Sequence, residues 1–288
     1  MTGPTLVLAL CTLIWGLTFV VVKDALAASD AFTFLALRFS LGALACLLWA
    51  RAAVLHRDVL SAGLVLGLVL FAGYAFQTFG LEGTSPSRSA FLTGLAVLGV
   101  PFVSWGLLGR APAWTSVLGA SVALAGLWRL TGFGVTEPLS RGDLLTLGCA
   151  LAYAVHISLT EKVARAGASV ALVAVQLATV AGLSALAVPL GTPRLEPTPA
   201  YWGAVAATGL IASALAISIQ TWAQAHASAV RAAVIFSLEP VVAVVASTAL
   251  GRERPGPSEL VGGGLIVLGV LVSEVGGALR PHATRSPS

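Results

Sequence analysis

Hydrophobic residues run in long unbroken stretches along this 288-residue chain, and short polar joints separate the stretches. Apolar positions are continuous rather than alternating, which favours helices over the strands of a membrane barrel. A helix rises about 1.5 Å per residue, so about 20 apolar residues cross the roughly 30 Å hydrocarbon core of a bilayer. The pattern predicts ten such helices, at residues 5–22, 32–50, 59–81, 89–109, 112–130, 144–160, 170–190, 201–223, 230–250 and 258–279.

The composition agrees with a membrane protein. Hydrophobic residues make up 57% of the chain and charged residues only 10%, and the mean hydropathy is +0.94. Soluble proteins carry roughly 25% charged residues, because water must solvate their surface. A soluble enzyme, a secreted disulfide scaffold and a disordered chain are therefore excluded, and membrane lipid is the expected surroundings. The net charge of +4 is spread over single basic residues, so we expect no nucleic-acid partner.

The chain repeats itself. At a displacement of 143 positions Gln77, Ser85 and Arg88 fall on Gln220, Ser228 and Arg231, and at 138 positions Trp15 and Arg38 fall on Tyr153 and Gln176. The agreement predicts two five-helix units, residues 1–138 and 139–288, within one transmembrane bundle. The fold class is therefore an all-α integral membrane protein with ten transmembrane helices in two repeats.

An odd number of crossings makes the second unit enter the membrane from the opposite side, so the repeats are inverted. Such repeats can exchange conformations and give outward-open and inward-open states. Gln77 and Arg88 then lie near one mouth, and Gln220 and Arg231 lie near the other. Gating is one interpretation of Arg88 and Arg231, and capping of helix joints at the interface is the alternative.

Several segments resemble the EamA family of the drug/metabolite transporter superfamily. They are Leu13–Phe19, Ala36–Phe39, Ser85–Gly94, Val230–Pro240 and Leu250–Glu253. The resemblance covers nearly the whole chain, and the Glu239-Pro240 pair is its most specific element. Ala96 and Val97 stand at the corresponding positions of the first repeat, so the pair is asymmetric.

The resemblance implies inverted repeats around a cavity lined mainly by the first, third, fourth, sixth, eighth and ninth helices. It also implies a multi-pass protein of the bacterial inner membrane with both termini in the cytoplasm. The implied activity is transport of a small-molecule solute, commonly export of amino acids or related metabolites. It implies no cofactor, and it does not identify the solute.

Glu239 is the first candidate for a functional residue, because it lies about ten positions into an apolar helix. A charge at that depth costs several kcal/mol unless it is paired, hydrated or protonated. It is interpreted as a contact for a substrate amine or as a proton site, and a structural glutamate is the alternative. His156 is a second candidate for proton coupling. Arg38, within the second helix, is expected to be structural and to extend toward the nearer membrane surface.

The remaining candidates are aromatic and uncharged polar residues on the helices that the resemblance places around the cavity. A solute site is typically apolar with a few placed polar groups. The predicted cavity residues are Trp15, Thr18, Phe19, Tyr74, Gln77, Thr78, Phe91, Tyr153, His156, Gln220, Trp222, Phe236 and Glu239. This inventory suits a neutral or zwitterionic solute better than a polyanion.

Two other functions are weighed against a metabolite transporter. A lipid or lipid-linked sugar flippase shares the helix pattern, but it would need basic residues for a phosphate headgroup. The apolar spans contain no lysine within the membrane, which weighs against a flippase. An intramembrane enzyme is disfavoured, because no catalytic motif such as GxSxG or HExxH occurs.

The glycines at 63, 67 and 262–264 allow close helix approach. A dimer through the last helices is an alternative, and a monomer is favoured.

Overall fold

The structure, a computed structural model, describes residues 3–50, 53–54, 56–109, 111–131, 139–251, 254 and 256–278. These residues are almost all helical, and their β-structure is limited to an isolated bridge between Ser29 and Leu195. The first repeat contains α1 (Gly3–Ala28), α2 (Ala31–Ala50), α3 (Arg57–Glu82), α4 (Pro86–Gly94), α5 (Ala96–Leu108) and α6 (Trp114–Thr131). The second contains α7 (Arg141–Val163), η2 (Ala166–Ala168), α8 (Ser169–Ala187), η3 (Val188–Leu190), α9 (Pro199–Ala206), η4 (Ala207–Leu215), α10 (Ala216–Gln224), α11 (Ala229–Phe236), α12 (Glu239–Ala249) and α13 (Pro257–Ala278).

The predicted helical membrane protein is confirmed. Within the described residues, eight helical segments are long and apolar enough to cross a membrane. Four of these segments combine consecutive helices, namely α4 with α5, α8 with η3, α9 to α10, and α11 with α12. The 18-residue α6 and the 22-residue α13 complete the ten expected segments. Large apolar side chains such as Trp49, Phe102 and Leu186 are exposed on the outside of the bundle, as a lipid-facing surface requires.

The two repeats pack as a pseudosymmetric pair. Helix α6 pairs with its counterpart α13 along one flank of the bundle, and α2 pairs with its counterpart α8. Contacts between helices that are not counterparts also follow the repeat. In the first repeat α3 and α5 pack on α7 of the second, and the counterparts α10 and α12 pack on α1 of the first. The halves therefore meet along α1 and α7, which is where a site shared by both repeats would lie.

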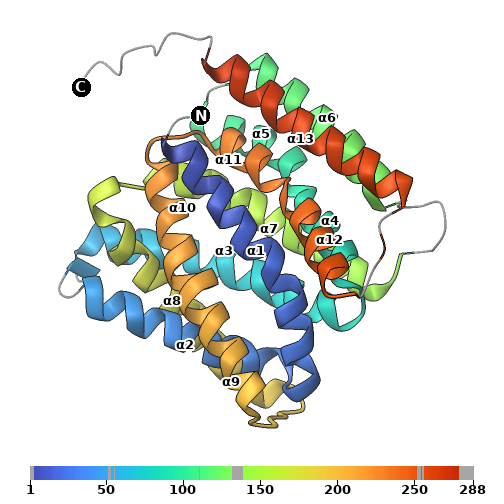
Figure 1. The fold of residues 1–288 in the computed structure, drawn as a ribbon. Helices are drawn as coiled ribbons and strands as arrows, with labels where there is room; N and C mark the ends of the chain where they lie inside the picture. The colour runs from blue at the N-terminus through green and yellow to red at the C-terminus, as the bar shows by residue number, and fades with distance from the viewer. Residues whose placement is uncertain are drawn as a thin grey trace.

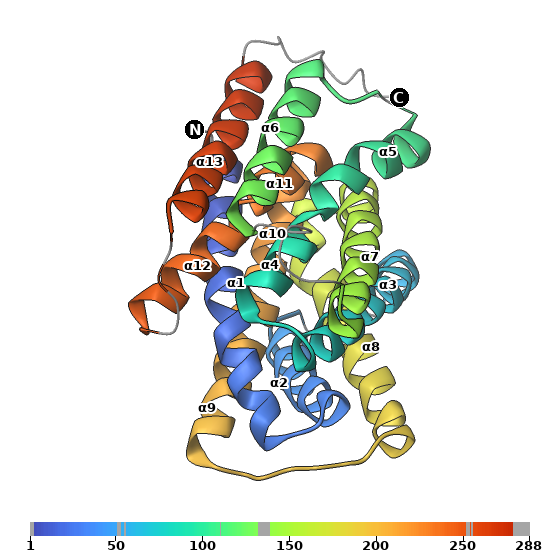
Figure 2. The same cartoon turned by 90° about the vertical axis from the view of Figure 1, so that its right-hand side faces the viewer.

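The fourth span of each repeat is broken at the same place. Helix α4 ends at Gly94 and α5 begins at Ala96, while α11 ends at Phe236 and α12 begins at Glu239, and both spans change direction there (Figure 2). Each starts with a serine whose side chain accepts a hydrogen bond from an arginine backbone N–H, Ser85 from Arg88 and Ser228 from Arg231. Pro240 therefore is not required for the break, because the first repeat has Val97 at that position.

The glycines that allow close helix approach pack against other helices of the same chain. A Cβ built on Gly63 or Gly67 would collide with Val175 or Thr179 of α8. One built on Gly119 of α6 would stand 2.6 Å from the carbonyl oxygen of Gly269 in α13. Helices α3 and α8, and α6 and α13, thus touch backbone to backbone, and these motifs have intramolecular partners.

Substituting Gly269 by leucine is expected to destabilise the protein by about 1–3 kcal/mol, because overpacking forces α6 and α13 apart. A Cβ on Gly269 would stand 2.5 Å from the Gly119 oxygen. Thermal unfolding in detergent measures the change. Gly264→Leu on the same helix is the matched control, since a Cβ there meets no atom within 4 Å. Equal unfolding temperatures for the two variants would contradict the close contact.

Candidate functional site

A cavity lies between the two repeats, at the level of the broken spans. Its empty volume is about 800 Å³, part of it continuous with solvent. Most of the predicted cavity residues line it: Trp15, Thr18, Phe19, Tyr74, Gln77, Tyr153, His156, Gln220, Phe236 and Glu239. Helices of both repeats thus contribute to one site, as the inverted-repeat interpretation predicts.

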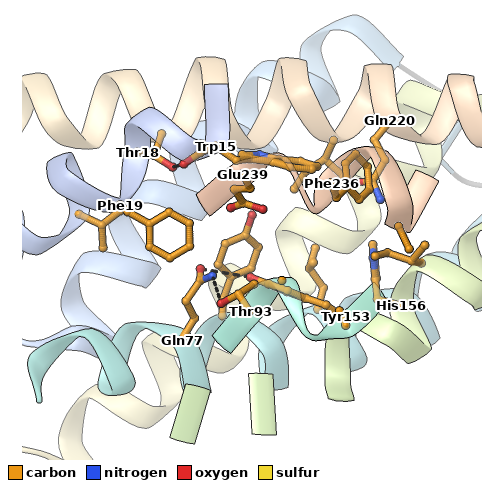
Figure 3. A pocket seen from close by; sticks show the side chains of 18 of the residues that line it. Trp15, Thr18, Phe19, Gln77, Thr93, Tyr153, His156, Gln220, Phe236 and Glu239 are labelled. Carbon is orange, nitrogen blue, oxygen red and sulfur yellow. Dashed lines mark hydrogen bonds between the residues drawn. The ribbon is translucent and has the colours of Figure 1, made fainter. Parts of the chain in front are cut away.

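Glu239 is the acidic residue of this cavity. It is the first residue of α12, directly after the break, and its side chain is 8% exposed. Figure 3 shows its carboxylate pointing into the space between Trp15 and Phe236 on one side and Gln77, Thr93 and Tyr153 on the other. No described residue forms a salt bridge or a side-chain hydrogen bond with it. A buried carboxylate without a protein partner is costly in a membrane and calls for a ligand, a proton or water.

Aromatic rings form the walls around this carboxylate. Trp15 and Phe236 meet edge to face with ring centroids 5.2 Å apart, and Tyr74 meets Tyr153 in the same way at 5.6 Å. The indole N–H of Trp15 donates to the Ala212 carbonyl oxygen at 2.8 Å. That oxygen belongs to η4, a π-helical stretch of the eighth span, and such stretches are frequent at functional sites. These contacts fix the rings, so the cavity has a preformed shape.

Uncharged polar groups face the site from α3, α4 and α7. The Tyr153 hydroxyl donates to the Gln77 side-chain oxygen, and the Gln77 amide donates to Thr93, both at 3.3 Å. His156 is 2% exposed and shares a 2.8 Å hydrogen bond with Gln176 of α8. His156 thus has a neighbouring partner, as the structural interpretation of a lone histidine requires. Thr93 was missed, because only the fold brings α4 beside Gln77.

Three predicted cavity residues do not line the cavity. A helix turns about 100° per residue, so neighbours on one helix face different directions. Thr78 is buried beside Gln77 but outside the lining, and Phe91 packs in the core among the helices around α4. Trp222 is 38% exposed and stacks on His226 near the end of α10, since it lies about 200° around that helix from Gln220.

The expected extension of Arg38 toward the membrane surface was also wrong. Its side chain does not extend to the membrane surface; it is 3% exposed and lines the cavity. The Nε atom donates to the Ser213 hydroxyl at 3.0 Å, and the guanidinium carbon lies 4.8 Å from the centre of the Tyr74 ring. The second helix therefore contributes to the site together with the helices named by the family resemblance.

The end of the bundle at Arg88 is held together by charged groups. Arg88 forms a 2.9 Å salt bridge with Asp143, which joins α4 of the first repeat to α7 of the second. Asp143 also accepts a hydrogen bond from Thr84, and Lys23 donates to the carbonyl oxygens of Leu81, Glu82 and Thr84. Asp143 and Lys23 were not predicted as site residues, because each lies in a different part of the sequence from its partners.

A second link at this end joins the α1–α2 turn to the segment between α8 and α9. The backbone N–H of Arg194 donates to Asp30 at 2.9 Å, and the Arg194 guanidinium donates to the Leu26 carbonyl oxygen. Partial burial opposes ionisation of Asp30, but the hydrogen bonds from Arg194 and Thr33 outweigh it and lower the pKa of its carboxyl. Asp30 therefore stays charged and keeps the two repeats joined at neutral pH.

Polar contacts also join the opposite end of the bundle. Ser104 of α5 donates to Ser158 of α7 at 2.9 Å, again across the two repeats. Gln220 donates to Gln224, whose amide donates to the Ile157 carbonyl oxygen at 2.9 Å, and the Glu161 carboxylate accepts from the N–H of Ala229 at the start of α11. Arg231 lies beside this helix start, outside the cavity lining. The cavity thus lies between two sets of contacts, and each set includes one that joins the two repeats.

A helical bundle of two related halves around a shared cavity is typical of membrane transporters. The chain matches the sequence profile of the EamA-like transporter family twice, over residues 3–132 and 140–274. It therefore belongs to this family, and through it to the drug/metabolite transporter superfamily.

Two individual proteins are similar to this chain. An uncharacterized transporter of Archaeoglobus fulgidus is 32% identical over 265 residues, which cover 92% of this chain and 83% of that protein. A chain of known crystal structure superposes with a TM-score of 0.80 over 97% of this chain and 99% of its own length. At 22% identity the latter shows that the fold is shared.

Proposed function

We propose that the protein is a secondary transporter that exports small neutral or zwitterionic metabolites, amino acids among them, by alternating access. The observation that carries the proposal is the Glu239 carboxylate, which is buried among aromatic walls with no partner among the described residues. An ionisable residue at membrane depth marks a substrate or ion pathway. The uncharged polar groups of Gln77, Thr93 and Tyr153 beside it suit a solute with small polar groups and an apolar side group.

Alternating access is supported by the arrangement of the repeats. Each end of the cavity is crossed by a contact between α7 and the first repeat, Arg88–Asp143 at one end and Ser104–Ser158 at the other. Rocking of one repeat against the other would break one contact while the other holds. Since Arg88 lies at the start of a broken span, a change in the angle between α4 and α5 would move it relative to Asp143.

The protein would act in the bacterial plasma membrane with both termini in the cytoplasm. The basic C-terminal tail that favours this orientation lies outside the described residues. We also propose that the monomer is the functional unit. One chain encloses the cavity, and its close-approach glycines at 63, 67, 119 and 269 already pack against helices of the same chain.

Efflux from proteoliposomes tests the proposed function. Purified protein is reconstituted into liposomes loaded with a mixed pool of amino acids and other metabolites, and the retained solutes are measured by mass spectrometry with and without a pH gradient. We expect selective and saturable loss of neutral or zwitterionic solutes. Equal retention in protein-containing and empty liposomes, for protein that elutes as a folded monodisperse species, would contradict metabolite transport.

A further inference from the structure

Two opposite charges face the cavity. Glu239 enters it from α12, and Arg38 enters it from α2. Both side chains are more than nine-tenths buried, at 8% and 3% exposure. They do not form a salt bridge with each other, and neither forms one with any other described residue. Buried charges are usually paired, so two unpaired charges in one cavity indicate that a ligand completes them.

The contacts of Arg38 leave most of its donors unused. A guanidinium carries five N–H donors, and only the Nε donor has a partner among the described residues, the Ser213 hydroxyl at 3.0 Å. The terminal nitrogens are not sealed by surrounding protein atoms. They form the fork that binds a carboxylate in a bidentate fashion.

The surroundings hold this guanidinium in place. Its carbon lies 5.0 Å from the Phe39 ring centre and 4.8 Å from the Tyr74 ring centre, so two aromatic faces stabilise the cation. Ser213 belongs to η4, which also accepts the indole hydrogen bond of Trp15. A Cβ built on Gly209 of η4 would stand 2.7 Å from the Arg38 carbonyl oxygen, so α2 and η4 are in direct contact. Arg38 is therefore positioned before any ligand binds.

Tyr74 lines the same cavity as the two charged side chains. Its ring centre lies 4.8 Å from the Arg38 guanidinium carbon, and its ring meets the Tyr153 ring edge to face at 5.6 Å. The cavity thus has a positive pole, a negative pole and aromatic residues in its lining. A solute that carries both a carboxylate and an ammonium group on a small apolar frame would neutralise both poles at once. A plain amine or a plain acid would leave one buried charge unpaired.

We propose that Arg38 and Glu239 form a dipolar site that binds the carboxylate and the ammonium group of the same solute. The proposal rests on the proposed function, and it specifies that function by making amino acids the preferred class. It also assigns Arg38, a residue of the second helix, to substrate binding. The repeat supports the assignment, because the corresponding residue Gln176 is also polar and its partner His156 lines the same cavity.

Binding of matched probes to the purified protein tests the dipolar site. L-Phenylalanine, L-leucine and L-alanine are each compared with the corresponding amine and carboxylic acid by calorimetry in detergent. The native protein should bind at least one amino acid about tenfold or more tightly than both of its truncated analogues, since each lost contact is a hydrogen bond to a charged group. Equal affinity for an amino acid and its analogues, or binding of none of the nine probes, would overturn the proposal.

Variants assign the two poles. Arg38→Gln should remove the preference for the amino acid over its amine, and Glu239→Gln should remove the preference over its acid. Arg38→Lys keeps the charge but lacks the forked N–H donors, so it should retain part of the preference for the amino acid over its amine. Arg165→Gln, an exposed arginine before α8, is the matched control and should bind like the native protein. Unchanged preferences in folded Arg38→Gln would remove Arg38 from the site.

The outcomes separate this proposal from the proposed function. Efflux of a different solute class through the native protein, without amino-acid binding, would sustain transport and overturn the dipolar site. Selective amino-acid binding that depends on Arg38 and Glu239, without efflux from liposomes, would sustain the site and overturn export.

Discussion

Glu239→Gln is expected to reduce transport about tenfold to a hundredfold while the yield of folded protein stays unchanged. Glutamine has the same shape as glutamate, so the side chain can keep its place in the cavity. It lacks the negative charge, and a hydrogen bond to a charged group contributes about 1.5–3 kcal/mol, where about 1.4 kcal/mol corresponds to a factor of ten. Initial efflux rates from proteoliposomes measure the loss.

Stability of the same variant provides an independent measurement. Because Glu239 is buried without a salt bridge among the described residues, its charge destabilises the folded protein unless a proton or ligand neutralises it. We therefore expect the thermal unfolding temperature of Glu239→Gln to equal or exceed that of the native protein. A structural glutamate would behave oppositely, with a lower unfolding temperature.

Two further variants complete the experiment. Glu239→Asp keeps the charge and should retain part of the transport activity. Glu196→Gln removes a carboxylate from the exposed segment between α8 and α9, and it should transport like the native protein. Full activity of Glu239→Gln would exclude Glu239 both as a substrate contact and as a proton site.

Hydropathy and the internal repeat predict the bundle well, because each depends on residues that are adjacent or equally spaced in the sequence. The breaks in the fourth spans were not predicted in the first repeat. Glu239-Pro240 marks the break in the second repeat, yet Ala96 and Val97 occupy the same place after an equivalent break. The Glu-Pro pair therefore does not account for both breaks, and the residues beside each break pack against the opposite repeat, α4 on α7 and α12 and α11 on α1 and α5.

Residue type alone separates cavity residues from core residues poorly. Gln220 and Trp222 could not both face the cavity, because they are about 200° apart on one helix, and that constraint was available from the sequence. The inward direction of Arg38 was not, since it depends on Ser213 and Tyr74, each on another helix. The repeat carried a partial signal, because Arg38 and Gln176 are polar residues at matching positions within apolar spans.

Covalent closure of the Arg88 end is expected to abolish transport. In a background without Cys11, Cys46 and Cys149, the double variant Arg88→Cys with Asp143→Cys places two thiols where a 2.9 Å salt bridge joins the repeats. Crosslinking with a short bifunctional thiol reagent that contains a cleavable disulfide would fix α4 to α7. Since rocking of the repeats must separate these helices, efflux should stop after crosslinking and return after reduction.

A third cysteine reports which side of the cavity is open. Thr93→Cys places a thiol in the cavity lining, and its labelling by a membrane-impermeant maleimide from the Arg88 side should disappear in the crosslinked protein. Each single cysteine variant, treated with the same reagent, is the control and should keep transporting.

The pair Ser104→Cys with Ser158→Cys closes the other end and should also stop efflux, while leaving Thr93→Cys accessible from the Arg88 side. Native efflux rates in either crosslinked protein would show that its contact does not lie on the transport path, and alternating access between these two ends would then be wrong.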